Sequence, residues 1–245
     1  MTEPPAPSGP ASPAPAPPSD LVQALRGLRV WDPKVSALPL FDPAAAPAEP
    51  VALFAAWFGE VVAAGEVEPH TMSLATADAE GRPDVRTVML HDVDAHGWHF
   101  ASHAGSRKGR HLAARPYASL GFYWPLLGRQ VRVRGGVTVQ PAEVAHADLH
   151  ARSTGALAAA LVGRQSEVLP AYEELERASQ AAWERASQAA WERAEREPDV
   201  AVPSWTAYVV EPDEVEFFQG DARRRHVRLN YRREGDGWVT ELLWP

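Results

Sequence analysis

Short strand-like segments separated by tight turns constrain the fold of this chain more than any other feature of its sequence. Turn-forming residues fill 78–81 (Asp-Ala-Glu-Gly) and 94–97 (Asp-Ala-His-Gly). Tight turns of this composition join strands that run antiparallel. Several short strands in succession therefore favour an antiparallel barrel. The segments predicted as strands in this part of the chain are 71–77, 85–91, 98–102, 117–124 and 128–139.

The last of these segments shows the two-residue period of a strand most clearly. Val131 and Val133 fall on one face, whereas Gln130, Arg132 and Arg134 fall on the other. One face is thus suited to a core and the other to polar contacts. Strand-like segments return near the C-terminus, at 205–210, 214–218, 227–232 and 238–243.

Helical patterns occupy the remaining parts of the folded chain. The stretches 141–162 and 166–196 predict a helical insertion of about residues 141–196. We therefore expect one domain, residues 39–245, that is mainly β with flanking helices (α+β). An earlier helix is predicted over 51–64, where apolar residues recur at helical spacing: Leu53, Phe54, Trp57, Phe58, Val61 and Val62.

Residues 1–38 are predicted to form a disordered Pro/Ala-rich tail and an N-terminal arm. The first 18 residues are mostly Pro, Ala and Ser, which cannot bury enough apolar surface to fold. A second Pro/Ala-rich stretch, 39–50, is predicted as a linker or an extended arm.

The overall composition excludes several classes of protein. A net charge of -8 argues against general nucleic-acid binding, which favours a basic surface. The chain has no cysteine, so it has neither disulfides nor a thiolate metal site. Apolar runs fall short of the roughly 18 residues that span a bilayer. The N-terminal residues also lack the basic and apolar blocks of a secretory signal, so we expect a cytoplasmic protein without membrane contact.

An octapeptide, Ala-Ser-Gln-Ala-Ala-Trp-Glu-Arg, occurs twice in succession at 178–185 and 186–193. Eight residues advance a helix by about two turns plus 80°, so the two tryptophans do not share a face. We interpret the repeat as a small duplication that lengthens an exposed helix.

The turn Gly105-Ser106-Arg107-Lys108 is the most suggestive polar feature. It follows a predicted strand and begins a helix-like run that stops at Pro116. A helix start offers free N–H groups and the positive end of the helix dipole, and two cations lie beside it. The turn therefore suits a bound phosphate group, although an ordinary charged turn has the same composition.

Four further places carry polar residues that a strand protein does not need. Each has an ordinary interpretation: Arg86 as an edge arginine reaching solvent, Gln130 as a solvent-facing strand residue, and Ser166 as a helix cap. The fourth is the basic run 223–228, which also suits a polyanion patch, although the acidic chain argues against that. A metal site is not predicted, because His146 and His150 with Glu143 lack a fourth ligand.

Taken in order, these features resemble the pyridoxamine 5′-phosphate oxidase family of FMN flavoenzymes. The resemblance covers roughly residues 40–245. It is carried by Arg86-Thr-Val-Met-Leu90, by the segment from Phe100 to Lys108, by Arg129-Gln-Val131, by Arg164-Gln-Ser166, by Val215-Glu-Phe-Phe-Gln-Gly220, by Arg224-Arg-His-Val-Arg228 and by the final Leu243-Trp-Pro245.

This resemblance implies an FMN-binding split β-barrel that works as a homodimer, with FMN in a cleft at the subunit interface. Arg86, Ser102, Arg107 and Lys108 would hold the FMN phosphate. Phe218 stands where the family usually has tryptophan. The full set of implied cofactor-binding residues is Arg86, Thr87, Val88, Leu90, Ala101, Ser102, Arg107, Lys108, Gln130, Gln165, Ser166, Phe218 and Arg228.

The implied reaction is an oxidation of a small-molecule substrate. A hydride leaves the substrate for FMN, and O2 then reoxidises the flavin to give H2O2. Arg224 and His226 match the family's catalytic and substrate-contacting Arg-x-His pair. Arg224 would orient the substrate, and His226 would hydrogen-bond it or shuttle a proton.

The resemblance weakens where the family grips its substrate's phosphate with Lys, Tyr, Arg and Ser. The Lys position is His91 here, and the Tyr position falls near Ala147 or Asp148. The Arg is retained as Arg152, whereas the Ser position is Ala156. The implied substrate-binding residues are thus His91, Arg152, Arg224 and His226.

These departures leave two substrates open: pyridoxine or pyridoxamine 5′-phosphate, and a phenazine-like reduced metabolite. Residues 100–113, with Tyr123-Trp124 after them, look closer to the phenazine-biosynthesis oxidases, a sister group. A non-catalytic flavin- or haem-binding split-barrel module is the alternative function. The retained Arg224 and His226 argue against it, because a storage protein has no need of them.

Overall fold

One antiparallel sheet forms the centre of the molecule in the computed structural model, which describes residues 18–28, 30–31, 38–196 and 202–245. Its main path runs in the order β2-β1-β5-β6-β7-β4-β3, and β8 and β9 extend it from β7. The strands are β1 Thr71–Ala77, β2 Pro83–Met89, β3 Asp92–Val93, β4 Trp98–His103, β5 Tyr117–Trp124, β6 Arg129–Val139, β7 Trp205–Gln219, β8 Val227–Glu234 and β9 Gly237–Leu242.

The long strand β7 makes the sheet a split barrel. Its first half pairs with β4 and its second half pairs with β8, while β6 runs beside both halves. The change of partner coincides with a bulge between Arg134 and Gly135. A Cβ atom at Gly135 would overlap the carbonyl oxygen of Glu211, so the two strands approach more closely there than a side chain allows.

The prediction of two separate strands, 205–210 and 214–218, is therefore wrong. Pro212 looks like a break in the sequence, but it lies at the bulge, opposite Gly135, where the ladder is already disturbed. The short strand β3 is also absent from the predicted set.

The core lies between the sheet and α2 (Pro50–Ala63). Phe54 packs edge-on against both Trp98 and Phe122, with ring centroids 5.5 and 5.1 Å apart. Burying side chains of this size contributes about 1.5–3 kcal/mol each. The predicted apolar stripe is confirmed at Leu53, Phe54, Trp57 and Val61, but Val62 is 53% exposed and faces away from the core.

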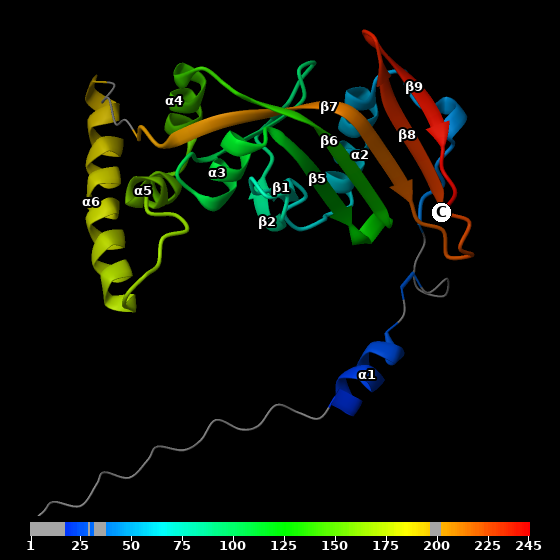
Figure 1. Ribbon diagram of the computed structural model, residues 1–245, viewed down its shortest axis with the longest axis horizontal. Coiled ribbons are helices and arrows are strands. Elements are labelled where there is room, and N and C mark those ends of the chain that lie inside the picture. Colours follow the sequence, from blue (N-terminus) through cyan, green and yellow to red (C-terminus); the bar gives the residue numbers. More distant parts are fainter. Residues whose placement is uncertain (1–17, 29, 32–37, 197–201) are drawn as a thin grey trace, which may run out of the picture.

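The α-helices that follow α2 gather at one end of the sheet, opposite β8 and β9 (Figure 1). They are α4 (Ala142–Ala151), α5 (Thr154–Val162) and α6 (Tyr172–Arg196), with α3 (Arg107–Ala114) beside them. The predicted stretch 141–162 is divided at Arg152 and Ser153, because Ser153 caps α5 by accepting from the Ala156 N–H. Within the repeat, Ala182 and Ala186 are buried and Trp183 is 51% exposed.

The N-terminal arm is partly packed on the domain. Phe41 meets Trp57 edge-on at 5.1 Å, and the Tyr231 hydroxyl donates to the Pro47 carbonyl oxygen at 2.7 Å. The predicted tail contains one helix, α1 (Pro18–Gly27), whereas residues 1–17 lie outside the described residues. Among the helices that the structure describes, none has the length and apolar character needed to cross a membrane.

Candidate functional site

The first group of predicted site residues converges on the start of α3. Ser106 is the N-cap, and its hydroxyl accepts from the Gly109 N–H at 3.2 Å. Gly109 is required there, because a Cβ would overlap the carbonyl oxygen of Ala104 in the preceding turn. We call the six residues that meet around this helix start the α3 cluster: Arg86, Ser102, Arg107, Lys108, Gln165 and Ser166.

Lys108 is the cation at the centre of the α3 cluster. It is only 8% exposed, and its Nζ donates to the Gln165 Oε1 at 2.8 Å. The Ser102 hydroxyl reaches the same Gln165 oxygen at 3.4 Å. Burial, with the nearby positive charge of Arg86, lowers the pKa of Lys108 to about 8. Within the described residues Lys108 has no carboxylate partner, so its charge is not compensated.

The other members of the α3 cluster are held in place by backbone and side-chain contacts. Arg86 donates to the Thr76 hydroxyl at 2.7 Å and pairs with Asp84 at 2.7 Å. The Arg107 backbone N–H donates to the Ser166 hydroxyl at 3.2 Å, which joins the loop after α5 to the start of α3. Ser166 adopts a positive φ of 73°, an unusual backbone conformation that is expected to be costly unless the site requires it.

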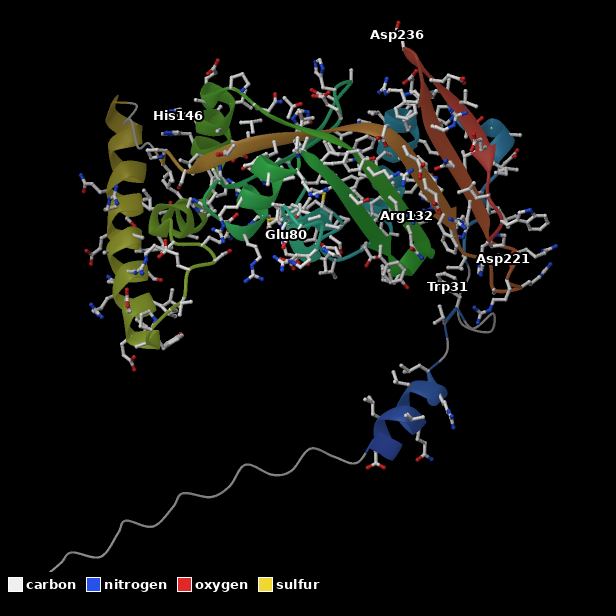
Figure 2. All side chains as sticks on the ribbon, in the orientation of Figure 1. Trp31, Glu80, Arg132, His146, Asp221 and Asp236 are labelled. Atoms are coloured by element: carbon white, nitrogen blue, oxygen red, sulfur yellow. The ribbon has the colours of Figure 1, made fainter. Side chains whose placement is uncertain are left out.

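A cavity of about 610 Å³ opens beside this helix start. Arg107, Arg110 and His111 line one side, and the β1–β2 turn with Asp78 and Glu80 lines the other. In Figure 2, Glu80 marks this turn below α3.

Four further predicted cofactor-binding residues lie on β2, just after it, or on β4, next to the α3 cluster. Thr87 is exposed on β2, and Ala101 lies on β4 directly before Ser102. Val88 and Leu90 are partly buried and pack against the core. Val88 and Leu90 thus have a packing role whether or not they contact a cofactor.

A second group lies on one face of β6, β7 and β8 and in the loop between β7 and β8, and we call it the β7–β8 cluster: Gln130, Phe218, Arg224, His226 and Arg228. Gln130 is the cross-strand partner of Phe218, which is in turn the partner of Arg228. These three side chains therefore share one face of the sheet. Phe218 packs on His226 with ring centroids 5.1 Å apart.

Arg228 is fixed by an ion pair with a buried carboxylate. Its Nε and Nη2 donate to the two Glu216 oxygens at 2.8 and 3.1 Å, and Nη1 donates to the Trp244 carbonyl oxygen at 2.7 Å. Arg132 also pairs with Glu216. Although burial opposes it, these two arginines lower the pKa of Glu216, so the carboxylate stays charged.

The loop between β7 and β8 positions the predicted catalytic pair. His226 Nδ1 accepts from the Asp221 backbone N–H at 3.0 Å, so Nε2 is the ring nitrogen that remains for a ligand. Arg224 is exposed, closes a turn by donating its N–H to the Asp221 carbonyl at 2.9 Å, and has a φ of 64°.

A third group contains the two predicted substrate residues that lie outside the β7–β8 loop. His91 and Arg152 are joined by Asp148, which pairs with His91 Nδ1 at 2.8 Å and with Arg152 Nε at 3.0 Å. Trp205 Nε1 also donates to Asp148 at 2.8 Å, and the Arg152 guanidinium stacks 4.6 Å above the Trp205 ring. We call these four residues the Asp148 cluster. Its donors hold the pKa of Asp148 well below its usual range, although burial opposes them.

One chain places these groups at its two ends. Figure 1 shows α3, α4 and α5 at one end of the sheet and the β7–β8 loop at the other. Figure 2 marks the same separation with His146 on α4 and Asp221 in that loop. The α3 and Asp148 clusters are therefore remote from the β7–β8 cluster within a single protomer.

Two tryptophans, one beside the β7–β8 cluster and one within the Asp148 cluster, are missed by the sequence reasoning. Trp31, in the N-terminal arm, lies 5.6 Å from His226 and 6.1 Å from Phe218, measured between ring centroids. Trp31 carries no sequence signal beyond being an isolated tryptophan in the predicted tail and N-terminal arm. Trp205 carries no signal beyond its place at the start of a strand.

Metal binding has no support in the described part of the chain. His146 and His150 stack with ring centroids 4.1 Å apart, but no group of three or more His, Asp or Glu residues there could hold an ion.

Comparisons with known proteins agree with this fold. The family profile described as "Pyridoxamine 5'-phosphate oxidase" matches residues 59–186, and that described as "Pyridoxine 5'-phosphate oxidase C-terminal dimerisation region" matches residues 205–245. The second match contains most of the β7–β8 cluster. Its presence supports a homodimer.

Curated relatives are similar over most of their length. A pyridoxine/pyridoxamine 5'-phosphate oxidase of Pseudomonas fluorescens is 41% identical over 82% of this chain and 91% of its own. The enzyme of the same name from Rubrobacter xylanophilus is 42% identical over 80% of this chain and 87% of its own.

Among solved structures, PhzG from Burkholderia lata, in complex with tetrahydrophenazine-1-carboxylic acid, superposes with a TM-score of 0.76. It is 29% identical and is aligned over 86% of this chain and 99% of its own. A related FMN binding protein from Nostoc punctiforme, at 19% identity and a TM-score of 0.61 over 83% of this chain and all of its own, supports the fold. The predicted split barrel and the predicted enzyme class are thus confirmed, and the chain belongs to the pyridoxamine 5′-phosphate oxidase family of FMN-dependent oxidoreductases.

Proposed function

We propose that the protein is an FMN-dependent oxidase that takes a hydride from a small (hetero)cyclic substrate and delivers the electrons to O2, forming H2O2. The observation that carries this proposal is the buried, uncompensated ammonium group of Lys108 at the start of α3. A buried cation of this kind is costly unless an anion completes its surroundings.

The residues of the α3 cluster fit the phosphate group of FMN. Lys108, Arg86 and Arg107 supply positive charge, and the start of α3 adds the positive end of its dipole. Ser102 and Ser166 supply hydroxyl groups, and Gln165 supplies an amide beside Lys108. When bound, FMN would supply the two-electron acceptor that the protein's own side chains lack.

We further propose that two protomers build each FMN site. The α3 cluster of one protomer would face the β7–β8 cluster of its partner, because the two lie at opposite ends of one chain. The dimerisation-region match over residues 205–245 supports this arrangement, since it covers Phe218, Arg224, His226 and Arg228. Gln130, Phe218 and Arg228 would then border the flavin.

Arg224 and His226 would act on the substrate. Arg224 is exposed on a turn, so its guanidinium is available to orient the substrate and to stabilise negative charge. His226 keeps Nδ1 as the acceptor of the Asp221 N–H, so the neutral imidazole carries its proton on Nε2 and can donate it to the substrate. The ring of Phe218 fixes the orientation of that imidazole.

Two substrate classes are consistent with the family. The curated relatives are named for pyridoxine and pyridoxamine 5′-phosphate, whereas the PhzG structure holds a reduced phenazine carboxylic acid. A phenazine-like reduced ring is the second candidate substrate, and the Asp148 cluster favours it.

Spectroscopy and oxygen consumption together test the proposed function. The purified protein should show the absorbance bands of oxidised flavin at about one FMN per protomer. A reduced ring substrate should bleach those bands without oxygen, and admitting O2 should restore them with one H2O2 formed per substrate. A protein that stays colourless with added FMN would contradict the proposal. Bound flavin that neither substrate class reduces would instead support a non-catalytic binding module.

A further inference from the structure

The edge of Arg152 that recognises a phosphate group is already occupied by a carboxylate of the same chain. Arg152 Nε donates to Asp148 Oδ2 at 3.0 Å, and Nη2 donates to Oδ1 at 3.3 Å. This is the side-on, two-bond geometry with which arginine binds carboxylates and phosphates. A substrate phosphate would have to displace Asp148 to gain the same pair of bonds.

The carboxylate of Asp148 is fully satisfied where it lies. Besides Arg152, it accepts from His91 Nδ1 at 2.8 Å and from Trp205 Nε1 at 2.8 Å. Its two oxygens thus accept four hydrogen bonds, which is about their full capacity. Asp148 is also held from several directions, because its donors are Trp205 on β7, His91 after β2 and Arg152 after α4.

The positive charge of Arg152 is compensated within the cluster. The Asp148 carboxylate pairs with Arg152 Nε at 3.0 Å and with His91 Nδ1 at 2.8 Å. Arg152 Nη2 also lies against the His91 ring, 2.7 Å from Nε2 and 3.2 Å from Nδ1. The neighbouring Ala156 contributes no polar side chain, and the Ser153 hydroxyl is engaged in capping α5.

Two elements, β2 and α5, connect the Asp148 cluster to the α3 cluster. His91 follows β2, which carries Arg86, and Arg152 precedes α5, whose far end leads to Gln165. The nine residues of α5 span about 13 Å. If FMN is held by its phosphate at the α3 cluster, the Asp148 cluster lies about one helix length from that phosphate, on the same end of the protomer.

We infer that Asp148 determines substrate specificity in this protein: it acts as an internal anion that excludes substrates bearing a phosphate group and selects a ring substrate without one. This inference rests on the proposed function, because it places the Asp148 cluster beside bound FMN. A dianion entering here would meet the negative charge of Asp148 and an arginine that is already neutralised. A ring without a phosphate meets neither obstacle.

Calorimetric titration of the FMN-loaded, full-length protein tests the inference with two ligands that differ only in the phosphate, pyridoxal 5′-phosphate and pyridoxal. Both are already oxidised, so the heat reports binding rather than turnover. The variants are Asp148→Asn, which keeps the shape and removes the charge, and Asp148→Ser as a second neutral replacement. Asp94→Asn is the matched control, since Asp94 also pairs with a histidine, His99, at 2.9 Å but outside the cluster.

The wild-type protein should bind pyridoxal 5′-phosphate no more tightly than pyridoxal. Asp148→Asn should bind the phosphate ester about tenfold more tightly or better, because Arg152 regains two charge-assisted bonds, while pyridoxal binding stays unchanged. Asp94→Asn should behave as the wild type. The inference is overturned if the wild type prefers the phosphate ester by tenfold, or if neither neutral variant gains affinity for it. A protein that binds no FMN at all would contradict the proposed function instead.

Discussion

Lys108 presents a nearly buried ammonium group without a carboxylate partner among the described residues. Its pKa is lowered to about 8 by burial and by Arg86. A phosphate dianion bound against it stabilises the charged form, so binding takes up a proton above that pH. FMN affinity should therefore be constant between about pH 7 and 8 and fall by up to about tenfold per unit above pH 8, as measured by flavin fluorescence titration.

Replacing Lys108 tests the same assignment at one residue. Lys108→Met should weaken FMN binding about 10- to 100-fold at pH 7, because a charge-assisted contact is lost, and should flatten the pH dependence above pH 8. Arg115→Gln, at the opposite end of α3, is the control and should leave both unchanged. Unaltered FMN binding by Lys108→Met would contradict the assignment of the FMN phosphate to the α3 cluster.

Variants of the proposed catalytic pair, Arg224 and His226, should lose substrate oxidation while they keep FMN binding. Arg224→Ala should lower the rate of anaerobic flavin reduction by about 100-fold or more while the FMN content stays near that of the wild type. His226→Gln should have a smaller effect, because glutamine retains a hydrogen-bond donor but cannot carry a proton. Loss of FMN from Arg224→Ala would mean that this loop holds the cofactor rather than the substrate.

For individual residues, the α3 cluster can be predicted well from the sequence, whereas the Asp148 cluster can be predicted only poorly. Arg107 and Lys108 are adjacent in a recognisable turn, so their joint role can be predicted. The resemblance places Asp148 only near the family's Tyr position, and the tryptophan that donates to it lies 57 positions away. Only the folded chain brings Asp148 between the two residues predicted to bind substrate.

The turn between β4 and α3 is the element on which cofactor binding depends. Gly109→Ala would press a methyl group against the Ala104 carbonyl oxygen and displace the helix start. We expect a melting temperature lower by about 4–8 °C, equivalent to roughly 2 kcal/mol in a protein of this size, and weaker FMN binding. The control is Gly59→Ala in α2, where the added Cβ meets no atom within 4 Å and better helix propensity should stabilise the fold slightly.

Element boundaries could be predicted where a turn marks them and not where tertiary pairing decides them. The bounds of β1 and β5 agree with the predicted 71–77 and 117–124, since turn residues or proline flank them. By contrast, β7 continues through Pro212 because Gly135 permits a bulge there. The division between α4 and α5 likewise depends on the Ser153 cap within an otherwise helical run.

At the scale of the whole molecule, the fold class could be predicted because short strands and turns recur through most of the chain. That two chains build the site is an expectation that comes only from the family resemblance, because the residue pattern of one chain does not state how two copies meet. A single protomer holds the α3 cluster at one end and the β7–β8 cluster at the other, so the proposed flavin site needs two chains.

The FMN affinity of a heterodimer made from two defective variants tests most directly whether each flavin site is built by two chains. Lys108→Met removes the proposed phosphate contact of one protomer, and Arg228→Gln removes the proposed flavin contact of the other. Each variant alone should bind FMN poorly. A heterodimer purified through two different tags should bind about one FMN per dimer with wild-type affinity, since one site then combines the two unaltered halves. A heterodimer that binds no better than either homodimer would contradict the shared site.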